Sequence, residues 1–292
     1  MTKLSTYSSL LAGLALVGTI QQADAQQFTK RKQYTSIGVN LNAMNYFGDV
    51  NPQTNFASFK AGDTRPNLGI SITHRYFPRI SGRFGLAAGR VAANDDNQGG
   101  SGDAYYRNNR NVNFRTNIYE ASAVMIVDLI ENRNNYLKRP DFVPYLFGGI
   151  AGFYFNPQGT RNGGQTWTDL QPLKTEGVDY SRVSFAIPFG GGVRYRINRN
   201  MDASFEIGFR KTFTGYLDDV KGTYIGQAAL AQGDNAAGDR QYFGYGITKD
   251  HRNGTFDAAG VKRGQDKTDW YTVVGFSLNY ILNPRIKNPK FR

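Results

Sequence analysis

Apolar residues alternate with small or polar residues in many parts of this sequence. In the stretch NLGISITHRYFPRIS, residues 67–81, Leu68, Ile70 and Ile72 alternate with glycine, serine and threonine. Successive side chains of a β-strand point to opposite faces, so a period of two predicts a strand with one apolar face. Seven other segments repeat the pattern: 35–47, 82–91, 117–129, 142–155, 183–197, 201–213 and 269–282. The chain is therefore predicted to contain eight strands.

The connections between the predicted strands alternate between short and long. Those near 77–82, 130–141 and 198–200 are short or moderate, whereas the others are long and rich in Gly, Asn and Asp. Short turns on one side and long loops on the other are typical of outer-membrane barrels. We therefore predict an all-β fold over residues 34–283. It is an eight-stranded antiparallel transmembrane β-barrel of OmpA/OmpX-like size, with long extracellular loops and short periplasmic turns.

The faces opposite the apolar ones distinguish a lipid-facing barrel from a protein with an ordinary core. They carry glycine, serine, asparagine and a few charges, which suit the filled interior of a narrow barrel. We therefore expect the apolar faces to point outward into lipid. The alternative is a secreted β-sandwich or a periplasmic lipocalin-like barrel. In strand 142–155 the predicted outward residues are Val143, Tyr145, Phe147, Ala151, Phe153 and Phe155.

Aromatic residues on the predicted outward faces gather near the strand ends. Two such bands are typical of the membrane interfaces of β-barrels. The predicted bands are Tyr76, Tyr145, Tyr195 and Tyr280 near the short turns, and Phe155, Phe209 and Trp270 near the long loops.

The first 25 residues have the features of a secretory signal peptide. Lys3 precedes an apolar run over residues 10–20, and Ala23-Asp24-Ala25 is a small-residue cleavage site. We expect removal of residues 1–25, a periplasmic N-terminal segment over 26–33 and a basic periplasmic tail over 284–292. The predicted location is the outer membrane, with both termini in the periplasm. There is no cysteine, so thiol chemistry and disulfides are excluded.

Five charged residues have inward parity on the predicted strands. Charges away from water must be paired to be tolerated, so these residues predict an ion-paired network that closes the lumen. The alternative is an ion pathway through a narrow pore. The five residues are Arg75, Glu120, Arg194, Glu206 and Arg210.

The net charge of +12 concentrates on one side of the predicted barrel, at the turns and the C-terminal tail. One explanation is contact with inner-leaflet phosphates. The other is a docking rim for an acidic periplasmic partner. A secreted chain makes nucleic acid an improbable partner. The predicted rim consists of Arg79, Arg83, Lys138, Arg139, Arg196, Arg199, Arg285, Lys287, Lys290 and Arg292.

Catalytic and metal-binding patterns are absent from the sequence. His74 has outward parity, and His251 lies beside Asp250 without an identifiable third catalytic residue. The acidic pairs Asp95-Asp96 and Asp218-Asp219 lack the spacing of a calcium loop. We therefore expect no enzyme activity, no cofactor, no metal and no small-molecule substrate.

Two segments carry more than the strand pattern: NYFGDVNP (45–52) and TGYLDDVKGTY (214–224). Together with the eight-strand layout, they resemble a family of outer-membrane β-barrels from Bacteroidota that includes the PorG-type component of the type IX secretion system. The resemblance implies a non-enzymatic accessory or anchoring barrel of protein secretion, associated with a periplasmic ring. The alternative is a structural or adhesive barrel acting through its loops. The motif residues are Tyr46, Gly48, Asp49, Tyr216, Asp218, Asp219, Gly222 and Tyr224.

Overall fold

The computed structural model describes residues 32–50, 62–95, 110, 112–161, 164–232, 237–245 and 258–282. The predicted signal peptide and basic tail lie outside these ranges. Eight long strands form the fold, and a short strand, β6 (Trp167–Asp169), extends β5. The long strands are β1 (Thr35–Phe47), β2 (Arg65–Arg75), β3 (Ile80–Asn94), β4 (Asn113–Asp128), β5 (Phe142–Thr160), β7 (Val183–Arg196), β8 (Met201–Thr212) and β9 (Trp270–Leu282).

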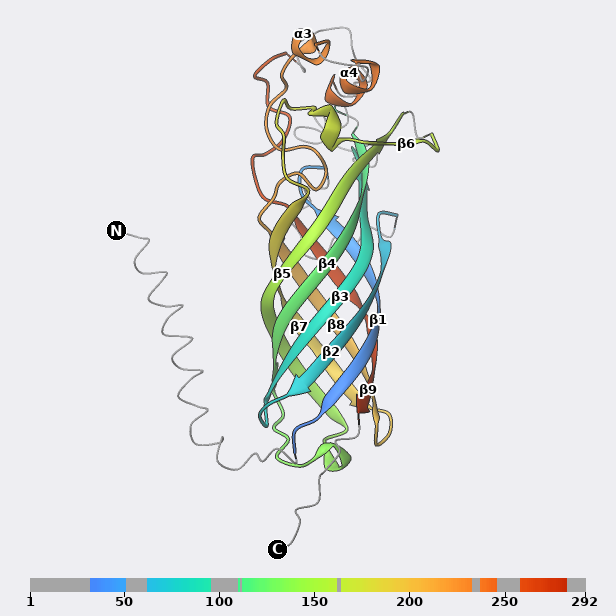
Figure 1. The fold of residues 1–292 in the computed structure, drawn as a ribbon, viewed down its shortest axis with the longest axis vertical. Coiled ribbons are helices and arrows are strands. Elements are labelled where there is room, and N and C mark those ends of the chain that lie inside the picture. Colours follow the sequence, from blue (N-terminus) through green and yellow to red (C-terminus); the bar gives the residue numbers. More distant parts are fainter. Residues whose placement is uncertain are drawn as a thin grey trace, which may run out of the picture.

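The eight long strands close into a barrel. Each pairs antiparallel with its neighbours in chain order, and β1 pairs with β9 over its whole length, from Thr35 opposite Leu282 to Phe47 opposite Trp270. The predicted eight-stranded antiparallel barrel is therefore confirmed (Figure 1). Closure gives each of the eight long strands a partner on both sides, so none of them is an open edge strand.

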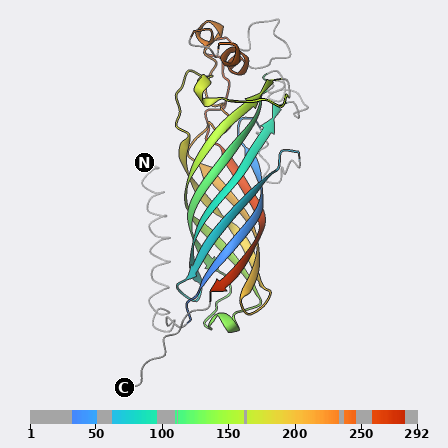
Figure 2. The same cartoon turned by 45° about the vertical axis from the view of Figure 1, so that its right-hand side comes forward.

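The two ends of the barrel differ. We call the end with connections 76–79, 129–141 and 197–200 the turn end, and the opposite end the loop end. The turn end carries a 3-10 helix, η2 (Tyr136–Lys138). The loop end carries η4 (Gln171–Leu173), α3 (Gln227–Leu230) and α4 (Ala237–Tyr245) above the strands (Figures 1 and 2). Among the described residues, no helix is long and apolar enough to cross a membrane.

Apolar side chains cover the outside of the barrel. In one row across three strands, Leu41 lies between Leu68 and Phe276, and each is at least 60% exposed. A monomeric soluble protein rarely exposes a contiguous apolar surface of more than a few hundred Å². Other exposed members of this surface are Ile37, Val39, Ile70, Ile72, Phe84, Leu86, Ile150, Phe185, Ile207 and Leu278.

The predicted outward face of the fifth strand is wrong. In β5 the odd-numbered aromatic residues point into the lumen, where Tyr145, Phe153 and Phe155 are each at most 3% exposed. Leu146 and Ile150 point outward instead. Both faces of this strand are apolar, so alternation alone could not distinguish them. The inward set is Val143, Tyr145, Phe147, Ala151, Phe153 and Phe155, so Tyr145 and Phe155 do not belong to the aromatic bands.

Candidate functional site

The turn end of the lumen is closed by two arginines on one aspartate. Asp128, at the end of β4, accepts from Nη1 of Arg75 at 2.8 Å and from Nη2 of Arg194 at 2.6 Å. Asp128 and Arg75 are almost completely buried. Arg75 also donates to the carbonyl of Pro78. The lumen is therefore obstructed just above the turns by this ion-paired cluster.

Two further ion pairs occupy the middle of the lumen. Glu206 accepts from Nη2 of Arg83 at 3.0 Å and from the hydroxyl of Tyr145 at 2.6 Å. Glu120 lies 3.5 Å from Nε of Arg210 and accepts from the hydroxyl of Tyr271 at 2.6 Å. A polar cavity of about 60 Å³ lies between these groups, which is room for a few water molecules.

The structure places all five predicted lumen charges inside the barrel. Their partners were largely missed by the sequence analysis, which overlooked Asp128 and Tyr271 and assigned Arg83 to the rim. That rim assignment is wrong, since Arg83 crosses the lumen to Glu206. The sequence did contain a signal for this inward position, because Arg83 precedes the outward residue Phe84 and therefore has inward parity.

An aromatic core lies in the lumen between these ion pairs and the loop end. Phe114 packs edge-on against Tyr46 at a centroid distance of 4.9 Å, and Phe153 packs against Tyr271 at 6.2 Å. Met44 and Leu217 are buried in the same cluster. The described part of the lumen is therefore filled by charged pairs below and by aromatic side chains above.

The two sequence motifs meet over this core. The hydroxyl of Tyr46 lies 2.6 Å from Oδ2 of Asp218 and 2.9 Å from Oδ1 of Asp269. Asp218 also accepts from the amides of Val50 and Val220, and Asp269 accepts from the amide of Leu217. These carboxylates therefore fix both loops to the end of β1. We call the two motifs, residues 45–52 and 214–224, together with the loop residues that contact them, the cap.

Gly48 is explained by the cap. A Cβ atom at this position would lie 1.9 Å from the Tyr46 hydroxyl oxygen and 2.3 Å from Oδ1 of Asp269. No side chain fits there without breaking the contact between Tyr46 and Asp269.

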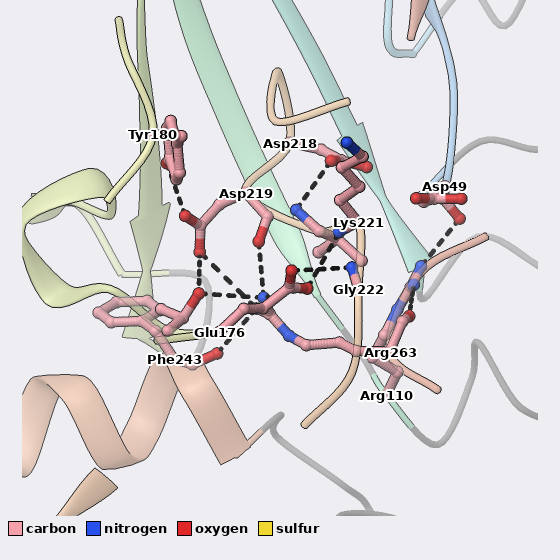
Figure 3. Close-up of polar contacts among 12 residues, drawn as sticks. Asp49, Arg110, Glu176, Tyr180, Asp218, Asp219, Lys221, Gly222, Phe243 and Arg263 are labelled. Carbon is pink, nitrogen blue, oxygen red and sulfur yellow. Dashed lines mark hydrogen bonds and ion pairs between the residues drawn. The ribbon is translucent and has the colours of Figure 1, made fainter. Parts of the chain in front are cut away.

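The second half of the cap surrounds Arg263. Its guanidinium donates to Oε1 of Glu176 at 3.1 Å and to the carbonyl of Asp219 at 2.6 Å, and it lies between these residues in Figure 3. It also donates to the carbonyl of Phe243 in α4. Glu176 in turn accepts from the amides of Lys221 and Gly222, which both lie in the second motif. One buried arginine thus joins the connection between β6 and β7 to two remote parts of the long connection between β8 and β9.

Asp219 has a left-handed backbone, with φ of 62°, which directs its carboxylate toward the segment before β7. It accepts from the hydroxyls of Thr175 at 2.5 Å and Tyr180 at 2.6 Å. The ring of Tyr180 stacks on that of Tyr216 at 4.4 Å. Tyr224, the last motif residue, is buried and pairs through its backbone with Val261 and Gly260. All eight motif residues therefore lie in or against the cap.

Arg110 connects the cap to the start of the loop between β3 and β4. It makes two bonds to the carboxylate of Asp95, at 2.8 and 2.9 Å. It also donates to the carbonyls of Asp49 and Arg263. Sequence analysis did not select Arg110, Glu176, Arg263 or Asp269, because a charge in a polar loop carries no mark of burial.

The cap carboxyls have raised pKa values because they are buried. Burial raises the pKa of Asp219 to about 6, against the opposing effect of Arg263, and burial likewise raises that of Asp49 to about 6. Burial and neighbouring carboxylates raise the pKa values of Asp218 and Asp269 well above the ordinary range. The folded cap therefore binds protons more tightly than the unfolded loops do.

This difference predicts a cap that loosens as pH rises. A raised folded-state pKa contributes stability that is complete below the unfolded value, near 4, and is lost as pH rises through about 6. For Asp219 alone the loss is about 3 kcal/mol. Amide hydrogen exchange of Leu217 and Val220, corrected for intrinsic rates, should show less protection at pH 7.5 than at pH 4.5.

Asp219→Asn is the matched control for this pH dependence, because asparagine tolerates the left-handed backbone and cannot ionise. It should make the pH profile of amide protection less steep by the share that Asp219 contributes, while Asp49, Asp218 and Asp269 still titrate. A wild-type cap whose protection increases with pH would contradict the assignment of buried, proton-binding carboxyls.

The predicted basic rim divides into two groups. Arg139 is buried, where it binds Asp202 at 2.7 Å and several turn carbonyls, so its predicted place on an exposed rim is wrong. Arg196 pairs with Asp141. Arg79, Lys138 and Arg199 are exposed at the turn end. The remaining predicted members, Arg285, Lys287, Lys290 and Arg292, lie outside the described residues.

Of the two histidines, only His74 lies in the described ranges, and its contact is with another side chain of the barrel wall. His74 points outward and shares a 2.8 Å hydrogen bond with the hydroxyl of Thr35. His251 and Asp96 lie outside the described residues. In the described part of the chain, no group of three or more acidic or histidine side chains is arranged to hold a metal ion.

A closed ring of eight antiparallel strands with a filled lumen and a loop-end cap defines a small β-barrel protein. The model of one protein family, a domain of unknown function designated DUF6089, matches residues 23–258. The chain belongs to this family. No curated protein matches the sequence.

Several solved outer-membrane barrels are similar to the structure. The N-terminal barrel of Pseudomonas aeruginosa OprF shares 10% identity at a TM-score of 0.33, covering 85% of this chain and 99% of that one. OprG of the same organism shares 12% at 0.37, covering 87% and 98%. The Yersinia pestis attachment invasion locus protein Ail shares 8% at 0.37, covering 85% and 99%. At these TM-scores the similarities carry no argument, and the barrel is established by its own strand pairing.

Proposed function

We propose that this protein is a non-conducting outer-membrane barrel that anchors a periplasmic partner, in the manner of the PorG-type component of type IX secretion. The membrane part of the proposal is supported by the outward side chains. They are apolar along the middle of the strands, as lipid requires, while the charged groups there point inward and are paired. A closed barrel also satisfies its backbone groups without water.

Val274 tests the lipid-facing assignment. It lies in the middle of β9, between the outward residues Ala43 and Ile207. Val274→Arg should cost about 2–4 kcal/mol of stability in a bilayer, because it places a charge at mid-membrane depth. Phe213→Arg, an exposed position just beyond β8, should cost less than half as much. The measurement is a denaturant titration of refolding in phospholipid vesicles, and equal costs would contradict the assignment.

The filled lumen is the observation that carries the anchoring proposal. A barrel whose interior is occupied by the Asp128, Glu206 and Glu120 ion pairs has little room for a solute. Its function is then exerted by its ends and not by transport. We expect purified protein in planar bilayers to give no stable channels. Stable ohmic conductance on the nanosiemens scale would contradict this prediction and favour the narrow-pore alternative.

The turn end is the proposed docking surface. Arg79, Lys138 and Arg199 are exposed there, and the predicted basic tail follows β9 from the same end. Charges of one sign on a rim raise the encounter rate with an oppositely charged partner. The resemblance of the two cap motifs to the PorG-containing family supports a periplasmic ring protein as that partner.

The test is co-purification in mild detergent, with captured proteins identified by mass spectrometry. Two charge-reversal variants separate the surfaces: Arg79→Glu, Lys138→Glu and Arg199→Glu together, and Arg285→Glu, Lys287→Glu, Lys290→Glu and Arg292→Glu together. At least one should insert normally and lose a periplasmic protein that the wild type captures, with wild-type capture weakening as salt rises. Lys174→Glu, a half-exposed lysine at the loop end, is the control. Unchanged capture by both variants would contradict the docking rim and leave lipid contact as the explanation of the charge.

A further inference from the structure

The outward side chains change from apolar to polar in register on β3, β4 and β5, with an arginine on each of β3 and β4 and amide side chains on β5. One row across these strands contains Ala88, Tyr119 and Tyr154, and the two tyrosine rings lie 6.4 Å apart. The next outward row toward the loop end begins with Arg90, which pairs with Asn117. The row beyond that contains Arg115, opposite Gln158. Aromatic residues followed by arginine and amide side chains mark the level where lipid headgroups lie.

Arg90 and Arg115 have only neutral partners among the described residues. Nε of Arg90 donates to Asn117 at 2.8 Å, and Nε of Arg115 donates to Gln158 at 2.9 Å. The guanidinium of Arg115 lies 4.0 Å from the ring centroid of Trp167 in β6, which holds it in place. The nearby Asp169 is hydrogen-bonded to Gln158 and forms no ion pair with either arginine. Two partly exposed guanidinium groups therefore lie on adjacent strands with no counter-ion among the residues that the structure describes.

A shallow apolar groove of about 820 Å³ lies directly below these arginines on the outer surface. Its floor is formed by the small residues Ala88, Ala121 and Gly152, between Leu86 and Tyr154. Gly152 is not required by packing, because a Cβ atom there would meet its nearest neighbour, the ring of Phe185, at an ordinary 3.8 Å. The groove and the arginines share strands β3 to β5, so a single ligand could occupy both.

We propose that Arg90 and Arg115 bind the phosphate of a phosphorylated outer-leaflet lipid whose acyl chain lies in the groove over Gly152. The chemistry is a charge-assisted hydrogen bond between guanidinium and phosphate. Apolar contact along the groove supplies the second part of the recognition. The inference rests on the proposed outer-membrane location, because only then does the loop end of the strands lie at the lipid headgroups.

The test is native mass spectrometry of the full-length refolded barrel in detergent, titrated with bisphosphorylated lipid A. Inorganic phosphate and a phosphate-free diacylglycerol are separate titrants. Wild type should retain lipid A and bind neither of the others measurably. The double variant Arg90→Gln and Arg115→Gln should lose at least tenfold in lipid A affinity. Gly152→Leu, which fills the groove and leaves both arginines, should also weaken binding.

Lys211→Gln is the matched control, because Lys211 is an exposed cation at the loop end of β8, on another part of the barrel. It should bind lipid A as wild type does. Undiminished binding by the double arginine variant would overturn the proposed site, and equal binding of inorganic phosphate would overturn its assignment to a lipid. Insertion into phospholipid vesicles, measured in parallel by heat-modifiable gel migration, separates these outcomes from failure of the membrane proposal itself.

Discussion

Asp128→Ala is expected to destabilise the barrel by about 3–5 kcal/mol, because it leaves the buried Arg75 and the partly buried Arg194 without their counter-ion. Asp128 is the only carboxylate that forms an ion pair with Arg75 or Arg194 among the described residues. The lumen around them is lined by protein, so the unpaired positive charges cannot recover full hydration. The measurement is the free energy of unfolding from urea titration in lipid vesicles.

Asp141→Ala is the matched control for Asp128→Ala. It also removes a carboxylate from an arginine at the turn end, Arg196, but Asp141 is 68% exposed. Exposed ion pairs contribute about 0–1 kcal/mol, so this variant should be nearly as stable as wild type. Similar costs for the two variants would mean that the lumen is wet enough to solvate Arg75 and Arg194, and would argue against a sealed turn end.

Arg263→Leu is expected to release the cap while leaving the barrel intact. The substitution deprives the buried Glu176 and Asp219 of their cation and removes the donor to Phe243 in α4. Breaking such a buried pair costs about 3–5 kcal/mol. Because every contact concerned lies above the strands, the loss should appear as local opening of the loops. The amides of Lys221 and Gly222 donate hydrogen bonds to Glu176, and their hydrogen exchange should accelerate at least a hundredfold.

Barrel integrity is measured in the same Arg263→Leu sample by heat-modifiable gel migration and by exchange of β8 and β9 amides. Lys174→Leu is the control, because Lys174 forms a half-exposed pair with Asp179 in the same connection. It should leave cap exchange within a few-fold of wild type. Protected Lys221 and Gly222 amides in Arg263→Leu would show that the cap is held by its aspartate hydrogen bonds without the arginine.

The charged network illustrates how far parity can predict an interior. Inward parity identified Arg75, Glu120 and Glu206 as lumen residues, because strand geometry leaves each side chain only two directions. Parity contains no information about distance across the lumen. The pairing of Arg83 with Glu206 joins residues 123 positions apart, and it depends on barrel closure. Arg83 was assigned to the rim because it lies near the start of its strand, close to a turn. Only the closed barrel brings Glu206 within reach of it.

In the cap, too, the sequence identified some of the residues but not the contacts between them. The motif residues Tyr46 and Asp218 were visible in the sequence only as a resemblance, 172 positions apart. Their contact, and the collision that excludes any side chain at Gly48, exist only after both loops fold over the barrel end. Arg263 and Glu176 gave no sequence signal, because a polar loop residue looks the same whether it is solvated or buried.

The sequence by itself determined the number of long strands and the outward face of seven of them, since alternation reports a local property of extended backbone. It could not orient β5, where Tyr145 and Phe153 on one face compete with Leu146 and Ile150 on the other. The tertiary structure decided which face of β5 points inward. With the odd-numbered residues inside, Phe153 and Phe155 fill the lumen beneath the cap and the hydroxyl of Tyr145 donates to Glu206. The tertiary structure also decided every ion pair and every cap contact, because those energies depend on burial and on distances between segments remote in sequence.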